Sequence, residues 1–202
     1  MTVIFFSKEP MIHLLPHWNF QGLEGMPVHV VAYTNLPYAE LFLNGKSLGK
    51  QTLEKFDCGK WLVPYEKGEI KVIGYNQEGT AVCFDSRKTS AKAHRLQLRQ
   101  ENFDVSANGE DAAIFTCYVV DESGNEVYDA QIDRVSFFTG TGCFVYSTGS
   151  DNTDHETIFH SWRKMYQGKI SIAVKITEKT GDLTLYAQAN GLISASAKII
   201  TQ

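Results

Sequence analysis

Long apolar runs, closely spaced cysteines and clustered basic residues are all missing from this sequence. No apolar run approaches the roughly 20 residues that a helix needs to cross a bilayer, so we expect no membrane partner. None of the four cysteines forms a CxxC pair, the spacing that is typical of a zinc knuckle. The formal charge is −4, and only residues 87–88 and 163–164 are adjacent basic pairs, which argues against a nucleic-acid partner.

The composition is that of a folded protein that needs no covalent staples. Its 202 residues are 43% hydrophobic, enough to bury a sizeable core and too apolar for disorder. Although four cysteines could pair, a chain of this size folds without disulfides, and we expect none. Cys83 and Cys117 fall in alternating segments, so we predict both to be small core residues on strands.

Alternation of apolar and polar side chains runs through nearly the whole chain, whereas strong helical periodicity is lacking. The clearest example is residues 169–176, where every second side chain is isoleucine or valine. In residues 39–49 an alternating segment runs into Asn44-Gly45, the commonest two-residue hairpin turn, which predicts a β-hairpin. Many short strands between Gly and Asn turns are typical of sandwiches, so we predict an all-β fold of two tandem immunoglobulin-like β-sandwiches.

A change in composition at residues 86–92 marks the predicted boundary between the two domains. This run is small, polar and without apolar periodicity, which is typical of a linker. We therefore assign residues 23–91 to the first sandwich and residues 92–202 to the second. Residues 1–22 lack a clear period and are interpreted as a connecting segment that lies against something else; simple packing on the first sandwich is the alternative.

Two expectations concern the inside of the second domain. Residues 144–162 are polar and irregular, so we predict a long loop there. The last three alternating segments, at residues 169–176, 183–189 and 193–199, are expected to form a meander that closes the sandwich.

Two tryptophans are the candidates for sugar binding, because an aromatic face stacks on the apolar face of a pyranose. In that interpretation Trp61 and Trp162 would be exposed platforms. The alternative is structural: Trp61 anchors the first core and Trp162 packs beneath the long loop, since large aromatic residues are mostly buried.

The acidic residues point to neither catalysis nor a metal. Asp151, Asp154 and Glu156 loosely resemble a calcium loop, but Glu156 stands where such a loop has glycine. We interpret them as part of a polar loop whose short side chains bind their own backbone, and we predict no metal and no cofactor. Acidic pairs such as Glu110-Asp111 fall in predicted turns, where carboxylates are usually solvated.

Several segments, in the same order along the chain, resemble the C-terminal region of glycoside hydrolase family two enzymes. They are residues 13–20 (HLLPHWNF), 39–49 (AELFLNGKSLG), 60–70 (KWLVPYEKGEI), 74–75 (GY), 119–125 (VVDESGN), 140–142 (GTG) and 190–192 (NGL). The first is similar to the conserved segment that directly follows the catalytic barrel in that family. One departure is residues 149–152 (GSDN), where the family often has GNGD, so any role of that loop in relatives is not carried over.

This resemblance implies that the chain is the accessory region of a β-galactosidase-like enzyme that hydrolyses O-glycosyl bonds. The two catalytic glutamates of the family lie in the barrel, upstream of residue 1, and no residue here matches either one. Since a retaining glycosidase needs two carboxyl groups about 5–5.5 Å apart, we expect this chain to have no catalytic residues and to be inactive alone. The barrel of the same parent chain is then its partner.

The resemblance also suggests where that partner binds. His17 and Trp18 follow the barrel directly, so we expect them to contact it, leaving an exposed apolar patch around Trp18 in the isolated chain. An independent carbohydrate-binding module that uses Trp61 or Trp162 is the competing hypothesis.

Overall fold

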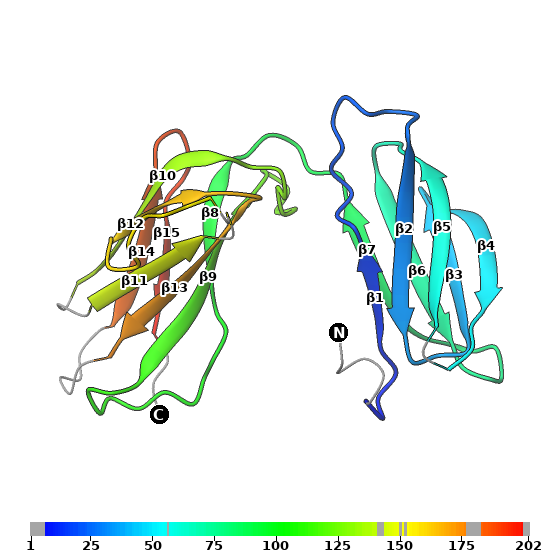
Figure 1. The fold of residues 1–202 in the computed structure, drawn as a ribbon, viewed down its shortest axis with the longest axis horizontal. Coiled ribbons are helices and arrows are strands. Elements are labelled where there is room, and N and C mark those ends of the chain that lie inside the picture. The colour runs from blue at the N-terminus through cyan, green and yellow to red at the C-terminus, as the bar shows by residue number, and fades with distance from the viewer. Residues whose placement is uncertain are drawn as a thin grey trace. The chain divides into compact units, whose positions relative to one another are not determined.

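The computed structural model describes residues 7–55, 57–140, 144–149, 151, 153–176 and 183–199. All regular elements in these ranges are β-strands, so none of them is a helix able to cross a membrane. The chain divides into two compact units, Met1–Thr89 and Ser90–Gln202, and each unit is built from two sheets (Figure 1). The predicted all-β fold of tandem sandwiches is confirmed.

The first unit is a sandwich of two antiparallel sheets with the strand orders β1-β2-β5 and β4-β3-β6-β7. Its strands are β1 (Ile12–Leu15), β2 (Pro27–Thr34), β3 (Tyr38–Leu43), β4 (Lys46–Thr52), β5 (Cys58–Pro64), β6 (Glu69–Tyr75) and β7 (Ala81–Lys88). Alternate residues of both sheets, among them Val30, Leu41 and Val72, are buried in a common core. Because β7 continues to Lys88, residues 86–88 of the predicted linker are strand instead.

Part of the predicted connecting segment is built into this first sandwich. β1 pairs with β2 in antiparallel register over its whole length. On the other side, the carboxylate of Asp85 in β7 accepts the backbone N–H of Leu14 at 2.9 Å. Packing on the first sandwich, the alternative left open by the sequence, therefore describes residues 12–15; residues 1–6 lie outside the described part of the chain.

The predicted hairpin of residues 39–49 is confirmed, and its turn also bonds to the segment that begins β6. Asn44 and Gly45 both have positive φ (50° and 81°), as a two-residue hairpin turn requires. The Asn44 side chain accepts the backbone N–H of Glu69 at 2.9 Å and donates to the carbonyl of Lys67 at 3.1 Å. The β3–β4 turn is thus fastened to the start of β6.

We expect Gly68→Ala to destabilise the first unit by roughly 2–4 kcal/mol, since strained backbone and overpacking each cost about 1–3 kcal/mol. Gly68 has φ +133°, and an added Cβ would lie 1.9 Å from the Asn44 Oδ1. Gly79→Ala is the matched control, because Gly79 also has positive φ but nothing lies within 4 Å of its Cβ position. Urea unfolding followed by circular dichroism measures the stability of both variants. Equal losses of stability would contradict the close contact between Gly68 and the Asn44 side chain.

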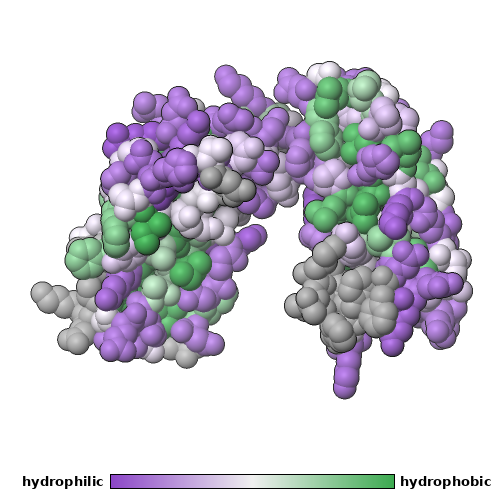
Figure 2. Space-filling view, in the orientation of Figure 1, coloured by the Kyte–Doolittle hydropathy of each residue, from purple (hydrophilic) through white to green (hydrophobic). Residues whose placement is uncertain are grey.

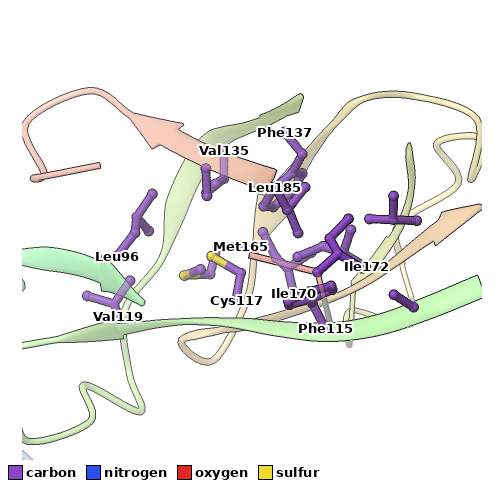
Figure 3. Packing of buried hydrophobic residues seen from close by; sticks show 14 of the residues in the cluster. Leu96, Phe115, Cys117, Val119, Val135, Phe137, Met165, Ile170, Ile172 and Leu185 are labelled. Carbon is purple, nitrogen blue, oxygen red and sulfur yellow. The ribbon is translucent and has the colours of Figure 1, made fainter. Parts of the chain in front are cut away.

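The second unit is also a sandwich of two antiparallel sheets, with the orders β12-β10-β14-β15 and β11-β13-β9-β8. Its strands are β8 (Arg95–Gln100), β9 (Ala112–Val120), β10 (Ile132–Thr139), β11 (Phe144–Gly149), β12 (Trp162–Met165), β13 (Lys169–Lys175), β14 (Thr184–Ala189) and β15 (Ala195–Lys198). Side chains such as Phe115, Phe137 and Ile172 point between the sheets and pack closely (Figure 3).

Two expectations for the second unit are wrong. Residues 144–162 are not one long loop, because Phe144–Gly149 forms β11, which pairs along its whole length with β13. The last strands are not a meander either: β13 pairs with β9 and β11, whereas β14 pairs with β10 and β15. The predicted alternation and the hairpin of β14 and β15 are correct, but β13 belongs to the opposite sheet.

The described cysteines are free thiols in two environments. Cys117 is fully buried in the core, as predicted, and burial raises its pKa to about 12. Cys83 lies on strand β7 but is only half-buried, and burial raises its pKa as well. Cys58 is half-buried at the start of β5, and Cys143 lies outside the described residues.

Candidate functional site

Trp18 is a core residue of the first unit. Its side chain has no exposed surface, and its indole N–H donates to the carbonyl of Glu66 at 2.9 Å. Its ring meets Tyr65 edge-on at 5.3 Å between centroids and Phe20 at 6.1 Å. Trp18 itself therefore has no surface to offer a partner, and the expected apolar patch around it stays a prediction.

His17 and Thr89 flank this buried tryptophan. His17 is half-buried, stacks on Phe20 at 4.8 Å and accepts the backbone N–H of Asn19 at 3.2 Å through Nδ1. The Thr89 hydroxyl donates to the carbonyl of Trp18 at 2.8 Å and accepts the backbone N–H of Gly68 at 3.2 Å. Of the two predicted interface residues, only His17 therefore has surface to offer a partner.

Trp61 belongs to the core as well. It lies on the inner face of β5 and exposes 9% of its surface. The ring fills the space next to Gly59, where an added Cβ would lie 2.3 Å from a ring carbon. A ring so enclosed presents no free face to a pyranose, so the structural alternative describes Trp61.

Trp162 lies on the outer face of the β12-β10-β14-β15 sheet and is half-buried. Its ring is stacked on His160, with 5.2 Å between centroids and 15° between planes. The guanidinium of Arg134 lies over the same ring, 4.8 Å from its centroid. Neighbouring side chains therefore already contact the surface that a sugar would need.

The segment between β11 and β12 is organised around a buried arginine that the sequence analysis missed. Arg163 exposes 2% of its surface and forms an ion pair with Asp154 at 2.9 Å. Its guanidinium also donates to the carbonyls of Glu156 and Thr157, both at 3.0 Å, and to the carbonyl of Ser147 in β11. One side chain thus ties this loop to both strands that flank it.

The acidic residues of this loop bind protein groups, as predicted. Asp151 accepts the backbone N–H and hydroxyl of Thr153, and Asp154 accepts the backbone N–H of Glu156 at 2.9 Å. The pKa of Asp154 is lowered, first by that backbone N–H and then by Arg163. Because its pKa is lower in the folded state, the Asp154 carboxylate stabilises the fold at any pH above the ordinary carboxyl pKa. This stabilisation is lost as the pH falls through the lowered pKa.

Three surface pockets on the described residues lack the facing pair of carboxyl groups that a glycosidase needs. One has a single carboxylate, Glu54, in its lining and the other two have none. Within the same residues there is also no cluster of three or more histidine, cysteine or acidic side chains that could hold a metal. The fold thus defines the class as tandem two-sheet β-sandwich domains, an architecture that alone implies no particular chemistry.

Comparison with known families agrees with this class. Residues 96–198 match the model of the glycoside hydrolase family 2 C-terminal domain 5, and residues 25–83 match a domain of unknown function (DUF4982). The chain belongs to the family of glycoside hydrolase family 2 C-terminal domains. It is a non-catalytic, accessory part of that architecture.

Individual relatives are much longer than this chain. It is 30% identical to beta-galactosidase BoGH2A of Bacteroides ovatus over 199 residues, which cover 96% of this chain and 23% of that protein. A beta-glucuronidase of Formosa agariphila is 24% identical over 96% of the chain and 20% of its own length. The crystal structure of a beta-glycosidase from Bacteroides vulgatus superposes with a TM-score of 0.89 at 27% identity, over 98% of this chain and 25% of that one. The chain thus spans about a fifth to a quarter of these relatives.

Proposed function

We propose that this chain is the C-terminal accessory region of a β-galactosidase-type enzyme, in which both sandwiches pack on and support a catalytic barrel of the same polypeptide. The observation that carries the proposal is the uneven coverage of the relatives. Nearly the whole chain aligns with BoGH2A, yet 77% of that protein lies outside the alignment. BoGH2A, at 30% identity over 96% of the chain, supports the galactosidase type, while two putative beta-glucuronidases of Formosa agariphila are 28% and 30% identical over 96% and 85% of the chain. Sequence identity therefore does not choose between the two substrates, and the substrate test below does.

The mechanism is structural. Interdomain contacts within one chain typically bury roughly 600–1,500 Å², so an accessory unit can stabilise a barrel without contributing to its chemistry. The acid and the nucleophile would come from the barrel, because a glycosidase needs a facing pair of carboxyl groups and none of the pockets above has one.

We expect the 202-residue chain alone to hydrolyse neither 4-nitrophenyl β-galactoside nor the β-glucuronide. The full-length enzyme that carries it should prefer the galactoside by at least about tenfold in kcat/KM, a difference of about 1.4 kcal/mol. Removing the 202 residues from that enzyme should lower the Tm of the remaining part by several degrees, since about 1 kcal/mol of lost contact shifts Tm by a few degrees. Hydrolysis by the isolated chain, or an unchanged Tm, would contradict the proposal.

A binding experiment on the same 202-residue chain tests the competing hypothesis of an independent carbohydrate-binding module. Isothermal titration with galactosides and plant polysaccharides should give no binding heat, because Trp61 is enclosed and Trp162 is covered by His160 and Arg134. Binding that disappears in Trp162→Ala would instead favour an independent module.

A further inference from the structure

The outer face of one sheet in the second unit carries an apolar groove that is separate from the hydrophobic core. Tyr146, Ala173 and Ile114 lie side by side on β11, β13 and β9, all on the outer face of their sheet. With Ile158 from the loop between β11 and β12 they line a groove of about 330 Å³. Figure 2 shows hydrophobic surface over the region of the second unit where Figure 1 places β11 and β13.

Two large side chains at the rim of the groove are presented to solvent by a fixed backbone. Ile158 and Phe159 expose 52% and 70% of their surfaces, and the ring of Phe159 meets Tyr146 edge-on at 5.7 Å. The carbonyl of Ile158 accepts the backbone N–H of Ser147 in β11 at 3.1 Å. Arg163 fixes the two preceding residues, so these exposed apolar groups are held in place rather than free to fold inward.

Away from the groove, two ion pairs lie on or beside the same face. Toward β8, Arg99 forms an ion pair with Glu101 at 3.0 Å, and Lys169 forms one with Glu126 at 3.0 Å. The groove itself has no charged side chain in its lining. Contiguous exposed apolar surface of this kind marks an interaction site. Ser147, Thr148 and Ser171 also line the groove, but the first two hydroxyls already donate to backbone carbonyls. This lining suits an apolar protein surface rather than a sugar, which needs several converging polar groups.

We infer that this groove, with Ile158 and Phe159 at its rim, docks an apolar surface of the catalytic part of the same polypeptide. The inference rests on the proposed function and identifies the contact that the second unit makes. In relatives that align with nearly the whole chain, the part outside the alignment is about three to four times as long as this chain. That part would contain the surface that the groove binds. A covalent link favours this partner over a separate protein. A separate protein needs an interface of about 1,000 Å² or more to bind stably. A domain of the same polypeptide can bind through a smaller surface, because the link holds it at an effective concentration of about a millimolar.

Hydrogen exchange tests the docking. We expect the backbone amides of residues 155–161 and 170–175 to exchange at least about tenfold more slowly in the full-length enzyme than in the 202-residue chain. Phe159→Ser and Ile158→Ser in the full-length enzyme should remove most of this difference. The matched control is Phe84→Ser, since Phe84 is 65% exposed on the outer face of the first unit and lies outside the groove.

Each other outcome has a defined meaning. Equal exchange rates in the two proteins overturn the inference. Self-association of the isolated chain in sedimentation velocity, lost in Phe159→Ser, would show that the groove binds a second copy and would also overturn it. If removing the 202 residues changes the Tm of the enzyme but the two serine variants have no effect on exchange, the docking site is wrong and the proposed function stands. An unchanged Tm on removal contradicts the proposed function itself.

Discussion

Trp18→Ala is expected to destabilise the first unit by about 3–5 kcal/mol, the usual cost of replacing a buried aromatic residue with alanine. The substitution would empty a fully enclosed site between Tyr65 and Phe20 and leave the carbonyl of Glu66 without its indole donor. Since folded domains are stable by only about 5–15 kcal/mol, this loss would shift or abolish the unfolding transition of the first unit. Urea unfolding followed by far-ultraviolet circular dichroism measures it.

The control for this change is Trp162→Ala. Trp162 lies on an outer face and contacts only His160 and Arg134 among the ring partners described above, so its loss should cost about 1 kcal/mol or less. Trp18→Phe should recover much of the stability, because it keeps an aromatic ring in the site. Equal effects of Trp18→Ala and Trp162→Ala would show that Trp18 is not the core residue described here.

Arg163→Met is expected to destabilise the second unit by about 3–5 kcal/mol, because removing one member of a buried ion pair leaves the other charge unpaired. Methionine keeps the length of the side chain but leaves Asp154 and the carbonyls of Glu156, Thr157 and Ser147 without their donor. The loop between β11 and β12 should then exchange its amides faster. Chemical unfolding and hydrogen exchange measure the two effects separately.

Lys164→Met is the matched control for the arginine change. The neighbouring Lys164 is exposed, so the same loss of charge there should change stability by no more than about 0.5 kcal/mol. The pH dependence adds a second check. Because the pKa of Asp154 is lowered, the difference between wild type and Arg163→Met should shrink as the pH falls below the ordinary value of 3.8. A difference that does not change with pH would mean that the ion pair contributes little.

Local features of the fold could be predicted because they depend on neighbouring residues alone. Asn44-Gly45 specifies a turn with two positive φ angles, and the structure has both. Residues 169–176 alternate with a period of two, and the predicted inward face is the buried one. Short polar side chains such as Asp151 bind nearby backbone, which needs no tertiary information.

Features that depend on distant parts of the chain could not be predicted in the same way. Alternation shows which side of β13 is buried but not which sheet it joins, so its pairing with β9 was missed. Trp18 lies in a segment without periodicity, and its burial depends on Tyr65 and Glu66, almost fifty residues later. For Arg163 the sequence did contain a signal. Arg163 lies two residues before Met165, so in a strand both side chains point to the same, buried face, and a charge there needs a partner.

Thr89 gives the first unit a practical boundary. Its hydroxyl bonds both to the carbonyl of Trp18, near the beginning of the described chain, and to the backbone N–H of Gly68. The last residue of the unit therefore closes it on itself, one position beyond the end of β7. A chimera that exchanges this sandwich between related enzymes would keep the clasp only if the transplanted cassette ends after Thr89, because a junction at the end of the last strand would cut it off.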